Sequence, residues 1–239
     1  MREHPIIFTA ESVRAIQADR KTQTRRLIKM TERARAGIAR IKAPPITVCG
    51  QARWPDGGPS TWNAFCRWQP GDHLWIKETW LLSSRDGLEC SVGYAARLPA
   101  GKTLEDTDGG LDIRTAPDHK LEPDPYRWRS PLFMPRWASR VTLEVVSVRA
   151  ERLHDISVAD IQAEGIALPV DVVGCPPGMG HPLVQVLDNP YKPGTKLTTW
   201  TEDDYWRSAF ACAWDKINKR RSPWSRNDYV WRTEFRRLV

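Results

Sequence analysis

Alternation between hydrophobic and polar residues is clearest at positions 140–149, whose sequence is RVTLEVVSVR. β-Branched residues in this period-two pattern predict a strand, and the segment YVWRTEFR at 229–236 is its expected partner in a sheet. Residues 73–80 predict another strand. One face of it carries Leu74, Ile76, Glu78 and Trp80, and the other carries Trp75, Lys77 and Thr79. Shorter strands are expected at 22–28 and 90–97.

Three segments have helical patterns. Residues 8–20 predict a short helix capped by Thr9 or Ser12, and residues 203–218 predict a longer one with a stripe of hydrophobic residues. Ser157 and Asp160 have the spacing of a capping box, and Gly165 is the expected end of that helix. Segments rich in Pro, Gly and Asp at about 43–68, 99–126 and 167–199 are expected to be loop-rich insertions.

This order of elements predicts an α+β protein: a small mixed β-barrel flanked by short helices, in one domain spanning residues 1–239. Strands do not alternate regularly with helices, which disfavours a doubly wound parallel sheet. The chain has no Walker loop and no glycine-rich dinucleotide motif, so neither an ATPase nor a Rossmann dehydrogenase is expected.

Cysteine usage and hydropathy restrict the class of protein further. The five cysteines are widely spaced without a CxxC pair, and the histidines lack ligand spacing, so neither a metal site nor a cofactor is expected. No apolar run approaches the ~20 residues of a membrane span, and the first residues lack a secretory pattern. We therefore expect a cytoplasmic protein without a membrane partner. The oligomeric state stays open.

Positive charge is concentrated at the two ends of the chain, which has a formal net charge of +7. Residues 1–42 contain 11 Lys and Arg against 4 Asp and Glu, and residues 215–239 contain 8 against 3. If the two ends meet in space they form one basic face, which is typical of proteins that bind nucleic acid or nucleotide phosphates. A basic surface that serves only solubility is the alternative. Some of the twelve tryptophans could stack on bases, although most are expected in the core.

The densest basic stretch is RKTQTRR at residues 20–26, and with its preceding helix it resembles the ASCH domain, a relative of the RNA-binding PUA fold. The segment QPGDHLWIKETW at 69–80 is similar to that family's PGD turn and following strand. MPRWASRV at 134–141, AEGI at 163–166 and the closing YVWRTEF at 229–235 are also similar, in the manner of a long, phage-associated branch. The resemblance implies a PUA-like barrel, and the three insertions lie outside it.

Some small members of this superfamily are amidohydrolases that remove the acyl group of N4-acetylcytidine with a Lys, a Thr and a Glu. The resemblance carries these roles to Lys21 and Thr24 in the KTxTxR pattern and to Glu164 in AEGI. A threonine hydroxyl needs a base to become a nucleophile. Lys21 can act as that base only if burial or neighbouring cations lower its pKa. Glu164 would carry a proton to the leaving amine.

Three functions remain open. The first is binding of RNA, DNA or a modified base in a basic cleft. The second is hydrolysis of an acylated cytosine nucleoside, and the third is ribonuclease activity, for which neither a metal site nor a histidine pair is present. The candidate substrate-binding residues are Arg20, Arg25, Arg26, Glu78 and Arg136.

Structural explanations compete at each of these positions. Lys21 could be a solvated residue at a helix end, and Glu164 an ordinary residue near a helix C-terminus. Glu78 is a charge on an apolar strand face and could form a salt bridge with Arg136 or Arg140.

Overall fold

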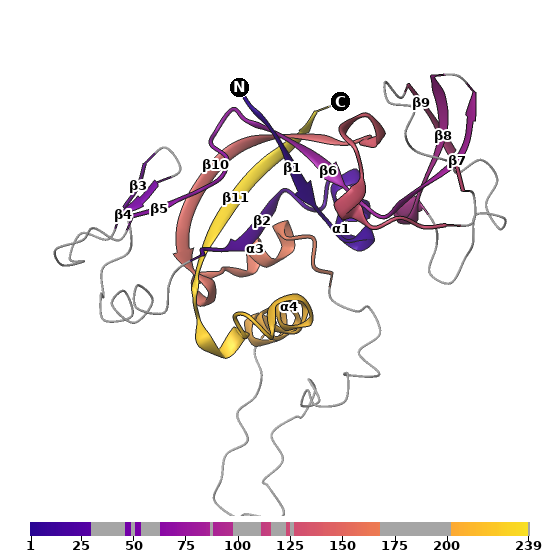
Figure 1. The fold of residues 1–239 in the computed structure, drawn as a ribbon. Coiled ribbons are helices and arrows are strands. Elements are labelled where there is room, and N and C mark those ends of the chain that lie inside the picture. Colours follow the sequence, from indigo (N-terminus) through magenta and orange to yellow (C-terminus); the bar gives the residue numbers. More distant parts are fainter. Residues whose placement is uncertain are drawn as a thin grey trace, which may run out of the picture.

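The computed structural model describes residues 1–29, 46–48, 51–53, 63–86, 88–97, 111–115, 123–124, 127–167 and 202–238. Over these ranges the protein is a mixed α+β structure (Figure 1). The strands are β1 (Glu3–Ile7), β2 (Gln23–Leu27), β3 (Ile46–Val48), β4 (Gln51–Arg53), β5 (Asn63–Phe65), β6 (His73–Lys77), β7 (Trp80–Asp86), β8 (Glu89–Tyr94), β9 (Leu111–Thr115), β10 (Thr142–Arg152) and β11 (Tyr229–Leu238). The α-helices are α1 (Ala10–Gln17), α3 (Val158–Ala163) and α4 (Glu202–Asn218). Short 3₁₀ turns include η1 (Ala95–Arg97), η3 (Pro131–Phe133) and η4 (Arg136–Ala138).

The largest sheet has the strand order β1-β6-β10-β11-β2. β1 and β6 run parallel, whereas the other neighbours are antiparallel, and β10 pairs with β11 as expected from their sequences. The expected closed barrel is not formed by the described strands: β1 and β2 are the two edges of an open, curved sheet (Figure 1). The edges nevertheless approach each other, because Arg26 Nη2 donates to the Ile7 carbonyl at 2.6 Å.

One face of this sheet packs on the main hydrophobic core. The alternation in β6 buries Leu74 and Ile76, and α1 adds Val13 and Ile16 to the same cluster. Phe8 and Phe235 complete it, with ring centroids 6.1 Å apart. Successive strand residues point to opposite faces, so residues 230, 232 and 234 of β11 face the other way, towards α3 and α4. Figure 1 shows these two helices on that side.

Two smaller sheets changed the expected picture. The strand predicted at 73–80 ends at Lys77 and a new strand, β7, begins at Trp80, where the chain joins the sheet β7-β8-β9. The segments 43–68 and 99–126, which were expected to be loop-rich, contain the short strands β3, β4, β5 and β9. β1 was not predicted either. The insertion at 167–199 lies outside the described residues apart from Ala167.

The helix termini follow the local sequence. The Thr9 side chain accepts from the Ser12 amide at the start of α1. Ser157 and Asp160 form a reciprocal capping box on α3, as predicted. After α3, Gly165 has φ +77°, a left-handed conformation that glycine adopts without strain. Within the described part of the chain, no helix has the length and apolar character needed to cross a membrane.

Candidate functional site

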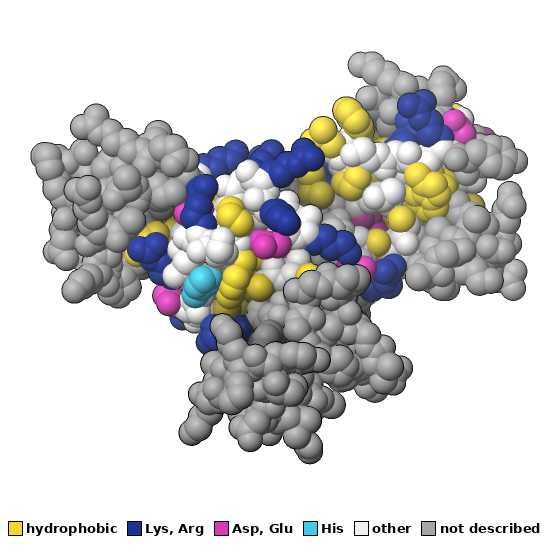
Figure 2. Space-filling model, turned by 90° about the horizontal axis from the view of Figure 1, so that it is seen from below, with side chains coloured by type: hydrophobic (Ala, Val, Ile, Leu, Met, Phe, Trp, Pro, Cys, Tyr) yellow, Lys and Arg dark blue, Asp and Glu magenta, His cyan; other side chains and the backbone are white. Residues whose placement is uncertain are grey.

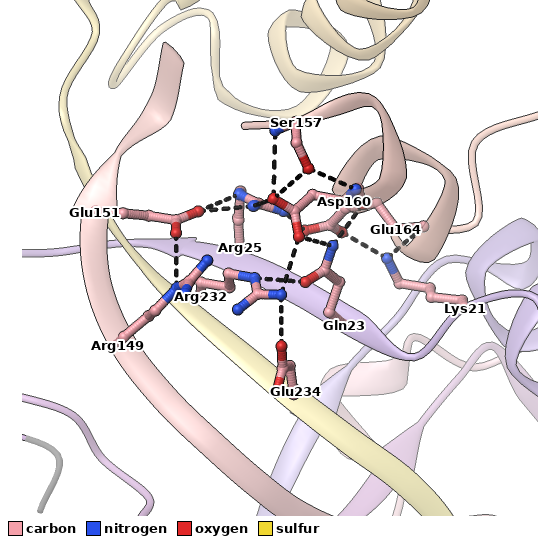
Figure 3. Close-up of polar contacts among 10 residues, drawn as sticks. All are labelled: Lys21, Gln23, Arg25, Arg149, Glu151, Ser157, Asp160, Glu164, Arg232 and Glu234. Carbon is pink, nitrogen blue, oxygen red and sulfur yellow. Dashed lines mark hydrogen bonds and ion pairs between the residues drawn. The ribbon is translucent and has the colours of Figure 1, made fainter. Parts of the chain in front are cut away.

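A buried network of charged side chains joins β2 to α3 (Figure 3). The strand contributes Gln23 and Arg25, the residue just before the strand contributes Lys21, and α3 with its C-cap contributes Asp160 and Glu164. Glu151 of β10 and Arg232 of β11 extend the network across the sheet. Thus three of the eight predicted site residues, Lys21, Arg25 and Glu164, lie in one cluster.

Lys21 and Glu164 are 143 positions apart in the sequence and form a direct ion pair. Lys21 Nζ lies 2.7 Å from Glu164 Oε2 and donates to the Glu164 carbonyl at 2.6 Å. Both side chains are buried, with exposed fractions of 6% and 7%. A lysine ammonium has three donors, so one remains beyond these two bonds for another group. The pair is therefore well formed, and a ligand would have to reach it in a place with little solvent.

Gly165 explains how these two residues come so close. A Cβ atom at this position would lie 2.9 Å from the Cβ atoms of both Ala15 and Lys21. Glycine therefore allows the end of α3 to contact α1 and the residue before β2. A backbone bridge between Lys21 and Glu164 closes the same junction. The side-chain contact thus depends on a close backbone approach that only the smallest residue permits.

The environment of Lys21 lowers its pKa below the ordinary value of a lysine. Burial is the largest cause, because desolvation penalises the charged ammonium. Glu164 opposes this effect by attraction and hydrogen bonding, while the positive charges of Arg26 and Arg25 lower the pKa further. Burial and neighbouring cations are the two causes that the sequence analysis required for Lys21 to act as a base, and both lower its pKa here.

Arg25 is buried and its charge is already matched. Its guanidinium donates to Glu151 Oε1 at 2.8 Å and to Glu164 Oε1 at 3.1 Å, and it lies 3.3 Å from Asp160 Oδ2. With a side chain only 1% exposed, Arg25 cannot bind a phosphate without breaking these pairs. Its geometry fits a residue that positions Glu164.

Asp160 shows the same balance of charges. Burial alone would raise the pKa of its carboxyl, but hydrogen bonds from Ser157 and Gln23 and the charge of Arg25 outweigh it and lower the pKa to about 2. Arg232 Nη2 donates to Asp160 Oδ1 at 2.9 Å and its Nε donates to Gln23. These partners were missed by the sequence analysis, in which Asp160 served only as a helix cap. For Arg232 the sequence indicated only that it lies in the terminal strand, which was predicted to pair in a sheet.

Thr24 lies on the opposite face of β2 from Gln23 and Arg25. It is 5% exposed and pairs across the sheet with Thr233, whose hydroxyl accepts from Trp68 Nε1 at 3.0 Å. By strand alternation Arg26 shares this face. The Arg26 guanidinium carbon lies 5.3 Å from the centroid of the Phe8 ring.

Lys21 Nζ lies 5.8 Å from the centroid of that same Phe8 ring. The ammonium therefore approaches the ring that the Arg26 guanidinium also approaches, although the Lys21 backbone adjoins α3. Burial lowers the pKa of Arg26 as well, and Glu164 counteracts this. The Lys21 ammonium, the Glu164 carboxylate that contacts it and the Arg26 guanidinium thus lie near Phe8, and Thr24 shares the strand face of Arg26.

The remaining predicted residues are separate from this cluster. Arg20 is exposed. Glu78, 1% exposed, makes a two-point pair with Arg140, at 2.9 and 3.0 Å, one of the two partners that the structural explanation named. Arg136 pairs with Glu3 at the surface, at 2.9 and 3.1 Å. Glu78 is therefore structural in this arrangement, while Arg136 is accessible at the surface in η4.

The two basic ends of the chain meet, because β2 pairs with β11 along their whole common length. Figure 2 shows Lys and Arg side chains across the described part of one face, with Asp and Glu side chains between some of them. Among the described residues, no group of three or more His, Cys, Asp or Glu side chains has a geometry that would hold a metal ion.

Comparison with known proteins gave no family by similarity: no family model, no curated protein and no solved structure matches the chain.

Proposed function

We propose that this protein is an amidohydrolase that removes the acyl group from an N-acylated cytosine, of the N4-acetylcytidine type. The observation that carries the proposal is the buried contact between Lys21 and Glu164, at 2.7 Å, together with the lowered pKa of Lys21. The resemblance to the ASCH domain singled out these two residues from distant parts of the sequence. A lysine can act as a general base at neutral pH only when its pKa is lowered towards neutrality.

We further propose that the fold is a variant of the PUA-like barrel. The approach of β1 to β2 through Arg26 and Ile7 supports it, because closing that gap would complete a barrel from the five-stranded sheet. The mixed pairing of β1, β6, β10, β11 and β2 supports it as well.

The reaction would proceed in two stages. Neutral Lys21 takes the proton of the Thr24 hydroxyl, and the oxygen attacks the acyl carbonyl to give a tetrahedral intermediate. The new ammonium is stabilised by Glu164 at its side. As the C–N bond breaks, Lys21 or Glu164 returns the proton to the exocyclic nitrogen of cytosine. Water then hydrolyses the threonine ester, which releases the carboxylic acid and restores the hydroxyl. Arg26, which shares the Thr24 face of β2 by strand alternation, would stabilise the oxyanion.

A second function, binding of a modified base without chemistry, is favoured by one observation. Glu164 contacts two cations, Lys21 and Arg25. Its carboxylate is therefore neutralised from both sides, which suits a fixed recognition element better than a group that must carry a proton. A site of this kind would bind RNA, DNA or a nucleoside and release it unchanged.

The test is incubation of the protein with N4-acetylcytidine, followed by chromatographic measurement of cytidine. We expect turnover by the natural chain and its loss in Lys21→Met, Thr24→Val and Glu164→Gln. Thr22→Val is the matched control, because it makes the same change from hydroxyl to methyl at an exposed residue two positions before Thr24. No cytidine from the folded natural chain would refute the hydrolase. Equal activity in Thr24→Val and Thr22→Val would exclude Thr24 as the nucleophile.

A further inference from the structure

A second surface of the protein combines an aromatic ring with two cations and two exposed apolar side chains. It consists of Trp75 and Lys77 of β6, Leu132 and Phe133 of η3, and Arg136 of η4, and we call it the Trp75 surface. Phe133 is 73% exposed and Leu132 is 62% exposed. Large apolar side chains that lie together in solvent mark interaction sites more often than isolated ones do.

Both cations of this surface lie over the Trp75 ring. Lys77 Nζ is 5.5 Å from a ring centroid of Trp75, and Arg136 Cζ is 5.9 Å from one. The Lys77 ammonium also donates to the Leu132 carbonyl at 2.5 Å, which ties η3 to β6. Glu3 and Thr142 accept from Arg136. The Arg136–Glu3 pair is exposed on both sides, with fractions of 43% and 49%, so an incoming anion displaces Glu3 at small cost.

The Trp75 surface begins beside the Lys21 site. The Phe8 amide donates to the Lys77 carbonyl at 3.2 Å, so the end of β6 touches the residue whose ring lies near Lys21 and Arg26. The Ile7 carbonyl, which accepts from Arg26, belongs to the residue paired with Lys77 in the sheet. Trp75 and Lys77 lie on the face of β6 opposite Leu74 and Ile76, so a chain with one base at the Lys21 site would pass around the end of β6 to reach Trp75 and Phe133.

We infer that the Trp75 surface binds single-stranded nucleic acid, with bases stacked on Trp75 and Phe133 and phosphates held by Lys77 and Arg136. Every base offers a flat face to an aromatic side chain, and lysine and arginine supply phosphate contacts, so this combination suits a single strand of any sequence. A duplex would keep its bases stacked inside and leave Phe133 in solvent. A purely apolar partner would desolvate the Lys77 ammonium and the Arg136–Glu3 pair beside Trp75.

Binding at this surface does not need the proposed hydrolysis, but it specifies the substrate when both hold. This second inference rests on the proposed function: the acylated cytosine is presented within a single strand, with its neighbouring nucleotides on the Trp75 surface. A free nucleoside would use the Lys21 site alone.

The test is fluorescence anisotropy with labelled, unmodified single-stranded RNA of eight cytidines, which requires no chemistry. We expect binding that weakens as salt rises, since phosphate contacts release counterions. Phe133→Ala and Trp75→Leu should each reduce affinity at least fivefold, and Lys77→Gln should reduce the salt dependence. Ile113→Ala is the control, because Ile113 is 64% exposed on β9, in a different sheet.

Three outcomes would overturn the inference: no binding of the RNA at low salt, equal weakening by Ile113→Ala, or equal affinity for a duplex of the same length. Turnover assays separate failure of the Trp75 surface to bind RNA from failure of the proposed hydrolysis. With an acetylated oligonucleotide, Phe133→Ala should raise KM at least fivefold with kcat unchanged, while its turnover of N4-acetylcytidine stays at the natural level. If the nucleoside is hydrolysed but the RNA does not bind, only the Trp75 surface is refuted.

Discussion

Replacing Glu164 by Gln tests whether a buried ammonium depends on this carboxylate. The change keeps the size of the side chain and an oxygen for Arg25, but Lys21 loses its anion in a place where only 6% of its side chain is exposed. A buried charge without its partner usually costs about 3–5 kcal/mol. Lys21 can avoid this cost by losing its proton, because Glu164 is the group that holds its pKa up against desolvation.

Deprotonation of Lys21 sets an upper limit on the stability that Glu164→Gln can lose. With an unfolded-state pKa of 10.5 for Lys21, holding the amine neutral costs about 4.8 kcal/mol at pH 7 and about 1.4 kcal/mol at pH 9.5, since each pH unit corresponds to about 1.4 kcal/mol. We therefore expect Glu164→Gln to lower the free energy of unfolding by about 3–4 kcal/mol at pH 7. At pH 9.5 the loss of unfolding free energy should be smaller by at least about 1.6 kcal/mol.

The partner substitutions make the reasoning quantitative. Lys21→Met should cost less, about 2 kcal/mol, because Glu164 keeps Arg25 at 3.1 Å. The double variant should be more stable than the sum of the single losses by about 2 kcal/mol, since no stranded charge remains. Glu3→Gln, which breaks an exposed pair with Arg136, should cost less than about 1 kcal/mol.

The assay is urea unfolding followed by tryptophan fluorescence at pH 7 and pH 9.5, with equal slopes required for all variants. Losses that add in the double variant and do not change with pH would refute the reasoning. They would mean that Lys21 and Glu164 are solvated and that burial does not control the lysine.

Three further predictions follow from single contacts. Gly165→Ala should lower the free energy of unfolding by about 2–4 kcal/mol, because the new Cβ would add left-handed strain and contacts at 2.9 Å. Gly71→Ala should lower it by only about 1–2 kcal/mol, because φ is +85° there but nothing lies within 4 Å of the Cβ position. Thermal or urea unfolding measures both. A similar loss in both would contradict the close approach. For Asp160, a folded pKa of about 2 against 3.8 stabilises the fold by about 2 kcal/mol above pH 4. This is lost as the pH falls from about 4 to 2, and Asp160→Asn should flatten that part of the pH–stability curve. Glu78→Gln should cost about 3 kcal/mol or more in urea unfolding by stranding Arg140, which is 5% exposed, and a loss below 1 kcal/mol would show that the pair is solvated.

The sequence by itself determined the local elements whose signals are short-range. The capping box of Ser157 and Asp160 formed as predicted, and so did the stop at Gly165, because both depend on hydrogen bonds and backbone angles within a few residues. The alternation in β10 and β11 was sufficient to predict their pairing, since a period of two with one buried face has few other solutions. β1 escaped detection because a proline stands within its five residues; it pairs in parallel with β6 from the sheet edge, where a missing N–H is tolerated.

Only the tertiary structure decided the surroundings of the candidate site. The sequence predicted that Arg25 would contribute positive charge to a cleft, but α3 with its C-cap and strand β10 together surround it with three carboxylates. Solvent exposure of Lys21 was equally undecided, since neighbours in the sequence do not reveal desolvation. Contact between Lys21 and Glu164 was implied by the family resemblance alone, and it forms because Gly165 lets two distant segments approach. Burial and long-range charge pairing arise from the whole fold, which is why composition and periodicity did not contain them.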